Sequence, residues 1–146
     1  MKKLVECVPN VSEGNDLSVI NKVVETVEKY PGIKLLNVDP GKATNRTVIT
    51  FVGDADIIVD AAFKLISKAK ELIDMRKHFG EHPRMGAVDV CPLIPISGIS
   101  MEETIDLAHK LSHRVGRELS IPVYCYENAA KENKRKNLAN CRAGEY

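Results

Sequence analysis

The chain has 146 residues, which suits one domain with its own hydrophobic core. Hydrophobic residues make up 44% and charged residues 28%, a composition that excludes a disordered or low-complexity chain. Lysine and arginine (21) nearly balance aspartate and glutamate (20), so no overall positive field favours nucleic acid as a partner. We also expect no signal peptide and no membrane span, since no run approaches the ~20 apolar residues that a span requires.

The first elements are predicted to be a strand and a helix. Residues 4–8 form a short apolar run that is typical of a buried strand, and the polar run 10–16 indicates a loop after it. Apolar residues then recur at helical spacing from Leu17 to Tyr30. Pro31 and Gly32 should end this helix.

A pair of strands and a long helix should follow. Residues 34–38 and 47–52 are apolar or β-branched runs, separated by the turn-rich stretch 39–45. A long apolar stripe then runs from residue 57 to residue 73, with lysines on the opposite side, which predicts an amphipathic helix. Asp54 is suitably placed to cap its first turn.

The next stretch is polar and contains histidines, from residue 75 to residue 86. A strand is predicted over 88–94, with Pro92 and Pro95 placing its end at a sheet edge or bulge. Ser100 and Glu103 form a capping box, so a helix should run from Met101 to about Leu119. A last strand over 123–126 and a solvated helix over 128–137 complete the predicted elements.

The first six elements follow the order β-α-β-β-α-β, which is the split βαβ or ferredoxin-like plan. We therefore predict an α/β (α+β) sandwich with a mixed sheet, helices mainly on one face, and a further helix-strand-helix extension.

Three polar loops interrupt the apolar pattern, at residues 9–14, 39–46 and 80–86. Each contains glycine, which lets the backbone approach a ligand, together with charged or hydrogen-bonding groups. In a βαββαβ plan the end of the first strand and the loop before the fourth strand can meet at one edge of the sheet. We therefore expect the three loops to build a single site.

Histidines are the most reactive candidates in these loops. Histidine as a residue type titrates near neutrality, and His82 lies in a segment without packing periodicity, so it could act as a general base, or equally be a surface histidine. The pairs His78 and His82, and His109 and His113, have the spacing of metal ligands on a helix. Because both pairs lack the glutamate of HExxH, we expect solvated helix faces and no metal site.

Charged residues near the loops could hold or orient a substrate. Arg46 and Arg84 could each bind a carboxylate through two hydrogen bonds, or simply form surface ion pairs. Asp39 and Asp89 stand at predicted strand ends, where either could orient a histidine. For Asp89 a structural role in the strand is equally consistent with the sequence.

Four cysteines lie far apart in the sequence, at Cys7, Cys91, Cys125 and Cys141. Without a CxxC pair they suggest neither a zinc site nor a redox dithiol. Three of the four lie in apolar strand-like runs, where we expect them to pack as small apolar residues, and a reduced, cytoplasmic setting is expected.

The three loops carry motifs that resemble one known family. These motifs are LVECVPNVSEG at 4–14, VDPGKATNRTV at 38–48 and GEHPRMGAVDVCPLIP at 80–95, with support from IPVYCYENAA at 121–130 and RAGEY at 142–146. Together they resemble the N-terminal subdomain of the formiminotransferase family. Lys42 departs from the smaller residue or proline associated with that loop.

The resemblance implies transfer of a formimino group from N-formimino-L-glutamate to tetrahydrofolate, which is a substrate of the reaction, with no metal. It implies that His82 is the catalytic histidine. We take Asp39 as its support and expect substrate contacts from five further residues, Asn10, Ser12, Glu13, Arg46 and Arg84.

The resemblance also implies that residues 1–146 are an N-terminal subdomain whose C-terminal counterpart is absent, although the folate groove needs both halves. One hypothesis is a catalytic half completed by a homodimer partner or a separate C-terminal chain. The other is a non-catalytic protein that binds folate or a partner chain. The choice between a formimino and a formyl donor stays open.

Overall fold

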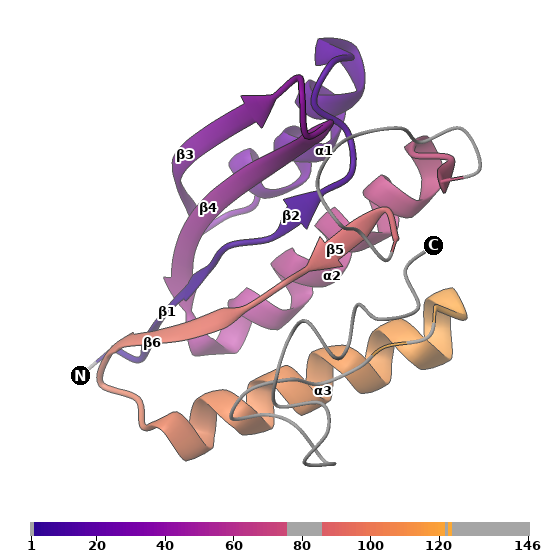
Figure 1. The fold of residues 1–146 in the computed structure, drawn as a ribbon. Helices are drawn as coiled ribbons and strands as arrows, with labels where there is room; N and C mark the ends of the chain where they lie inside the picture. The colour runs from indigo at the N-terminus through magenta and orange to yellow at the C-terminus, as the bar shows by residue number, and fades with distance from the viewer. Residues whose placement is uncertain (1, 76–85, 122, 124–146) are drawn as a thin grey trace.

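The computed structural model describes residues 2–75, 86–121 and 123 (Figure 1). Its elements, in chain order, are β1 (Leu4–Cys7), β2 (Asn10–Val11), α1 (Leu17–Glu28), β3 (Lys34–Gly41), β4 (Arg46–Asp54), α2 (Ala55–Leu72), β5 (Val88–Val90), β6 (Leu93–Ser97) and α3 (Met101–Leu119). The strand and helix predicted over 123–126 and 128–137 lie outside the described residues, apart from Val123.

The strands form one sheet in which several short pieces are aligned end to end. Strands β1 and β2 both pair with β4, while β6 pairs with β1 and β5 pairs with β2. Strand β3 pairs with the other side of β4. The sheet therefore has the lateral order β3, β4, β1 with β2, and β6 with β5, as the predicted ferredoxin-like plan requires.

All pairings between the described strands are antiparallel, so the expectation of a mixed sheet is wrong for this part of the chain. The physical reason is the way the two βαβ units interlock. Each helix connects two strands that run the same way, but a strand of the other unit lies between them. Parallel strands are thus never neighbours here.

Two prolines interrupt the strands and shift the predicted boundaries. Pro9 has no N–H for the ladder, so the first strand divides into β1 and β2, and Asn10 and Val11 pair with β4 instead of lying in a loop. Pro92 divides β5 from β6 in the same way, and its carbonyl accepts the Val8 N–H at 3.2 Å. Strand β3 also continues beyond its predicted end and includes Asp39.

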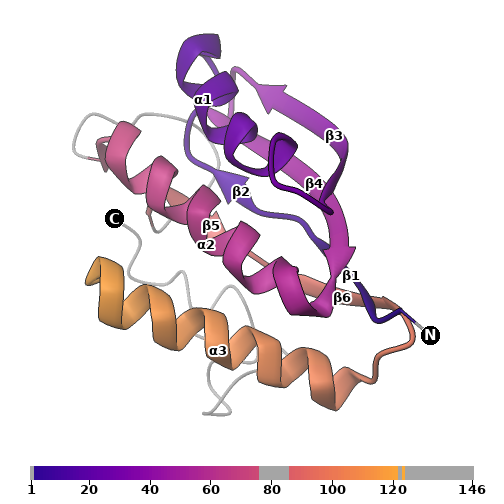
Figure 2. The same ribbon diagram turned by 180° about the vertical axis from the view of Figure 1, so that it is seen from behind.

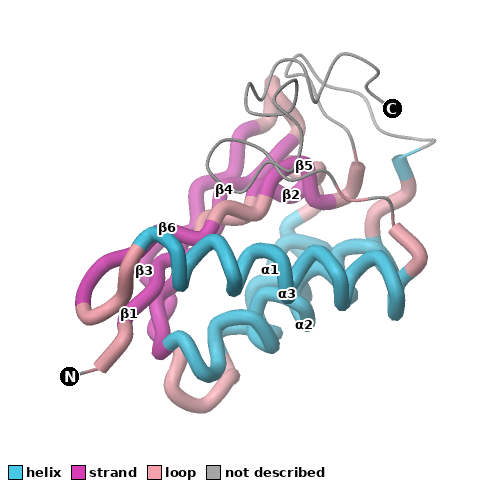
Figure 3. Tube along the Cα trace, turned by 90° about the horizontal axis from the view of Figure 1, so that it is seen from below, coloured by secondary structure: helices cyan, strands magenta, loops and turns pink. Residues whose placement is uncertain are grey.

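The helices form a layer over one face of the sheet, as Figures 2 and 3 show. The core between the layers consists of alternate residues of the central strands and the apolar stripes of α1 and α2, including Val5, Cys7, Ile49, Phe51, Val23, Val27, Ile58 and Leu65. Helix α3 packs against α2 and contributes Leu111 and Val115 to this core. None of the described helices is long and apolar enough to cross a membrane.

The predicted helix caps are confirmed. Asp54 accepts the Asp56 N–H at the start of α2, and Ser100 and Glu103 form the reciprocal capping box of α3. In α1, Asp16 accepts from the Ser18 and Val19 backbone amides. These caps fix where each helix leaves its preceding loop.

One polar cluster joins α2 and α3 to the turn that follows α1. Asp60 of α2 accepts from the Tyr30 hydroxyl and from Arg114 of α3, each at 2.6 Å. Arg114 also lies 3.8 Å from the centre of the Phe63 ring. The hydrogen bonds from Tyr30 and Arg114 lower the pKa of Asp60 below its usual value.

Replacing Asp60 by asparagine should make stability less dependent on acid pH. Because the folded-state pKa of Asp60 is lowered, its contribution is present above the unfolded pKa of about 3.9 and is lost as the pH falls through the folded value. Urea unfolding at neutral pH should show the variant about 1 kcal/mol less stable than the unmodified chain. At about pH 3 this gap should shrink; an equal gap at both pH values would contradict the prediction.

Candidate functional site

The first two motif loops are joined by hydrogen bonds and by close backbone packing. The Gly14 N–H donates to Asn45 Oδ1 at 2.9 Å, and the Thr47 hydroxyl donates to the Glu13 carbonyl at 2.5 Å. Gly14 is packed so tightly that an added Cβ would lie 2.1 Å from the Gly41 carbonyl oxygen. The loop after β2 is therefore held directly against the β3–β4 hairpin.

The third motif contacts the first loop through Gly86 and Ala87. The Ser12 hydroxyl donates to the Gly86 carbonyl at 2.6 Å, and the Ser12 N–H donates to the Ala87 carbonyl at 2.8 Å. His82 and Arg84 lie outside the described residues. Within the described chain, the predicted convergence of the three motif segments is thus confirmed.

Removing the Ser12 hydroxyl should weaken this junction. Ser12 is only 2% exposed, so Ser12→Ala would leave the Gly86 carbonyl without its short hydrogen bond in a site poorly reached by water. We expect a loss of about 1–3 kcal/mol in the free energy of unfolding, measured by urea denaturation. The exposed Ser18 supplies the control, since Ser18→Ala should change this value by less than about 0.5 kcal/mol.

Several candidates share the face of the sheet opposite to the helices. Asn10 and Asp39 both pair with Val48, one from each side. Residues directly opposite each other in antiparallel strands point to the same face, and Val48 alternates with the fully buried Thr47 and Ile49 of the core face. Asn10 and Asp39 therefore lie in one row, about 10 Å apart across two strand spacings.

Arg46 extends this group along β4. It lies two residues before Val48, so it points to the same face, and it is half-buried. Asp39 is exposed and Asn10 is 9% exposed, with its amide donating to the Val8 carbonyl at 3.4 Å. An amide, a carboxylate and a guanidinium thus lie on the same sheet face, beside the joined loops.

Two other candidates have structural contacts. The Glu13 carboxylate accepts the N–H groups of Asn15 and Asp16 at 3.0 Å each, which shapes the turn into α1. The Ser12 hydroxyl holds Gly86. Both residues therefore position the loops within the described chain.

Two residues that the sequence does not mark as important, Gly14 and Asn45, hold the first loop against the hairpin. Asn45 has a φ of 50°, in the left-handed region that asparagine tolerates better than most residues. Asn45 Oδ1 also accepts from the side-chain amide of Asn15, Nδ2, at 3.0 Å. The available signal was the Thr-Asn turn before a β-branched run, which predicts a hairpin without naming the bond.

For the remaining described candidates, the structure gives the position of each within its strand or helix. Asp89 is half-buried within β5. His109 and His113 lie on α3, where His113 is exposed, in agreement with an ordinary helix surface. Among the described residues no group of three or more His, Cys, Asp or Glu side chains is arranged to hold a metal ion.

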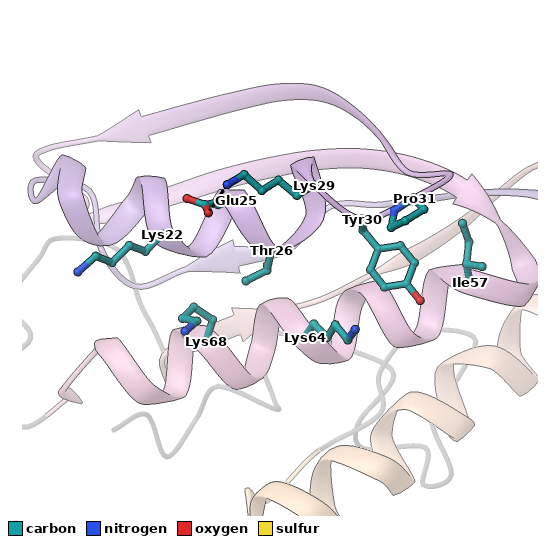
Figure 4. A pocket seen from close by; sticks show the side chains of 9 residues that line it. All are labelled: Lys22, Glu25, Thr26, Lys29, Tyr30, Pro31, Ile57, Lys64 and Lys68. Atoms are coloured by element: carbon teal, nitrogen blue, oxygen red, sulfur yellow. Dashed lines mark hydrogen bonds and ion pairs between the residues drawn. The ribbon is translucent and has the colours of Figure 1, made fainter.

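A groove lies elsewhere, on the helix layer. It has a volume of about 650 Å³ and separates α1 from α2, with Lys22, Lys29, Lys64 and Lys68 around Tyr30 and Ile57 (Figure 4). Three of these lysines form ion pairs with Glu25, Asp60 and Glu71. The groove contains none of the motif residues, and its paired charges are those of a solvated helix surface.

The fold and the joined loops define a ferredoxin-like α+β domain with a candidate site, built from loops, at its sheet. A family model described as formiminotransferase domain, N-terminal subdomain, matches residues 4–146. The chain belongs to this family, which confirms the resemblance carried by the three motifs.

Curated relatives are similar over the whole chain or nearly so. Formimidoyltransferase-cyclodeaminase of Rattus norvegicus is 51% identical over 146 residues, which cover 100% of this chain and 27% of that protein. Glutamate formimidoyltransferase of Streptococcus pyogenes serotype M1 is 47% identical over 146 residues, with 100% and 49% covered. The Thermoplasma acidophilum protein of the same name is 48% identical over 139 residues, with 95% and 46% covered. The chain thus spans between a quarter and a half of the length of these relatives.

Proposed function

We propose that the chain is the catalytic half of a glutamate formimidoyltransferase, which moves a formimino group from N-formimino-L-glutamate to tetrahydrofolate. The observation that carries this proposal is the junction of the three motif segments through Ser12, Gly14, Asn45 and Gly86. A site assembled from three distant segments is typical of binding and catalysis on a rigid scaffold. The names of the relatives supply the substrate class.

The proposed reaction requires one proton to move twice. The N5 amine of tetrahydrofolate attacks the amidine carbon, so a C–N bond forms and the amine proton passes to a base. The bond from that carbon to the glutamate nitrogen then breaks, and the departing nitrogen takes the proton. A single imidazole can carry out both steps near neutral pH, and we assign this role to His82.

The hydrogen bond between Ser12 and Gly86 supports this assignment, because only a short stretch of chain separates His82 from Gly86. His82 precedes Gly86 by four residues, and four residues of chain span at most about 14 Å. Gly86 is tied to Ser12, next to the strand that carries Asn10. We call the sheet face that carries Asn10, Asp39 and Arg46 the polar face. Covalent geometry therefore limits how far His82 can lie from the polar face.

The polar face has the chemistry that the two substrates would need. Arg46, with Arg84 from the third motif, would bind a substrate carboxylate through two hydrogen bonds. Asn10 would donate to charge that develops in the tetrahedral intermediate. Asp39 would stabilise the protonated form of His82, since a nearby carboxylate favours the imidazolium.

A second half would complete the site. On the sheet face opposite to the helices, Val48 and Val52 are half-buried, and Ile94 and Ile96 of β6 are 39% and 52% exposed. The relatives are two to four times as long as the matched segment. We propose that a second subdomain, like the remainder of the longer relatives, covers this face and excludes water from the site. We propose a cytoplasmic setting, because thiols stay reduced there.

The alternative function is a non-catalytic protein that binds folate or a partner chain. It is favoured by the exposure of Asp39 and Ile96 on this sheet face, since a transferase site normally needs a closed, water-poor groove. This alternative predicts folate binding without turnover even after the second half is supplied.

A chimera distinguishes the two functions. Residues 1–146 would replace the matched segment of the Streptococcus pyogenes relative, of which they span 49%. Transfer to tetrahydrofolate would be measured with N-formimino-L-glutamate and with the N-formyl analogue, for the chimera and for the chain alone. Turnover by the chimera supports the catalytic half. A folded chimera that binds tetrahydrofolate by calorimetry but does not turn over supports the alternative.

A further inference from the structure

Two thiols that the proposed reaction does not use lie in contact. Cys7 Sγ and Cys91 Sγ are 3.5 Å apart, although the two residues are 84 positions apart in the sequence. Cys7 ends β1, and Cys91 lies in the short break between β5 and β6, next to Pro92. The sequence alone predicts separate cysteines, because no local spacing links these two.

The neighbouring backbone allows the small movement that a bond would need. A disulfide has an S–S distance of about 2.05 Å, so the two sulfur atoms must approach by about 1.5 Å. Cys91 is outside the ladder, because β5 ends at Val90 and β6 begins at Leu93. Its main chain and side chain can therefore adjust without breaking the pairing of Cys7 with Phe51.

We propose that Cys7 and Cys91 are a reversible redox site, which forms a disulfide when a peroxide oxidises Cys91. In the first step the Cys91 thiolate attacks the peroxide, so that an S–O bond forms, the O–O bond breaks and hydroxide leaves. In the second step the Cys7 sulfur attacks Cys91, so that the S–S bond forms and the S–O bond breaks. The protons of the two thiols convert both departing hydroxides to water.

The order of the two steps follows from burial. Cys7 is fully buried, whereas Cys91 is half-buried and can be reached by a small oxidant. Burial, and the hydrogen bond with Cys91, raise the pKa of the Cys7 thiol well above its usual value, so Cys7 is not the first thiolate. Cys7 is instead already in place to attack, since its sulfur touches that of Cys91.

The bond would connect two chain segments that adjoin the first and third polar loops. Cys7 lies two residues before Pro9 of the first loop, and Cys91 lies five residues after Gly86. Closing a loop of this length restricts the unfolded chain, so the oxidised protein should melt about 5–10 °C higher than the reduced one. This effect is independent of any transferase activity.

Peptide mapping tests the bond directly. The full chain is treated with a molar excess of hydrogen peroxide, unfolded, blocked with N-ethylmaleimide and digested with trypsin. Trypsin separates the four cysteines into peptides 4–22, 85–110, 118–131 and 137–142. We expect peptides 4–22 and 85–110 to be joined with the loss of two hydrogen atoms, and dithiothreitol to separate them.

Two variants make the outcome specific. The double variant Cys125→Ser with Cys141→Ser should form the same linked peptide and show the same rise in melting temperature. Cys91→Ser, at the half-buried position, should lose both. The proposal is overturned if Cys7 and Cys91 are recovered blocked by maleimide, if Cys91 is oxidised to the sulfinic acid without a link, or if peptide 4–22 is joined to either of the other two.

Discussion

The variant His82→Ala of the chimera should lose formimino transfer by a factor of about 10²–10⁴, the usual contribution of a positioned general acid and base. The loss should appear in kcat, because the imidazole would transfer the proton during the chemical step. KM for N-formimino-L-glutamate should change little, since Arg46 and Arg84 would still bind its carboxylates. Steady-state rates at saturating tetrahydrofolate measure both constants.

The control is another histidine of the same chain. His113 is exposed on α3, and His113→Ala should leave kcat within about twofold of the unmodified chimera, as expected for a surface change. Circular dichroism would check that both variants keep the fold. An equally active and folded His82→Ala chimera would remove His82 from the mechanism while leaving membership of the family untouched.

The variant Gly14→Ala should be the most destabilising single-methyl addition in the described chain. Its Cβ would lie 2.1 Å from the Gly41 oxygen, 2.7 Å from the Arg46 nitrogen and 2.9 Å from the Arg46 oxygen. All three are backbone atoms, so no side chain can rotate away and the first loop must separate from the hairpin. We expect a loss of about 3 kcal/mol or more, near the upper end for overpacking.

A second glycine offers a matched control. An added Cβ at Gly116 of α3 would meet its nearest atom, the Ile121 oxygen, at an ordinary 3.8 Å. Alanine is preferred over glycine within a helix, so Gly116→Ala should raise the free energy of unfolding by about 0.5–1 kcal/mol. Urea unfolding of both variants measures the contrast, and a Gly14→Ala chain as stable as Gly116→Ala would disprove the close packing of the two loops.

The helices could be predicted from the sequence because their signals are local. Ser100, Glu103 and the apolar spacing after them place α3 at the bounds that the structure shows. Asp54 likewise marks the start of α2. Such signals depend on neighbours three or four residues away, which a single sequence displays in full.

Strand ends and the direction of pairing were harder to predict. Asp39 was assigned to a loop because Asp-Pro-Gly is typical of turns, but pairing with β4 continues as far as Gly41. Asn10 is polar, yet the neighbouring β4 and β5 strands make it part of the sheet. These outcomes depend on strands distant in the chain, so local propensity carries little information about them.

The convergence of the three motif loops could be predicted from the sequence, whereas the individual contacts between side chains could not. The three motif loops were expected to converge, and the bonds of Ser12 and Gly14 confirm this for the described residues. The contact between Cys7 and Cys91 has no local signature, since it depends on the register of β1 against the distant β6. Asn45 likewise contacts the distant Gly14, whereas the Glu13 carboxylate accepts from amides only two and three residues away.

The lateral order of the sheet also affects how the chain can fold during synthesis. Strand β1 leaves the ribosome first, but its two neighbours are β4 and β6, and β6 is the last described strand to be made. Until then Val5 and Cys7 have a partner on one side only. Pairings between distant segments slow folding and leave strand edges open to other chains, so we expect a nascent chain that depends on chaperones until β6 has docked.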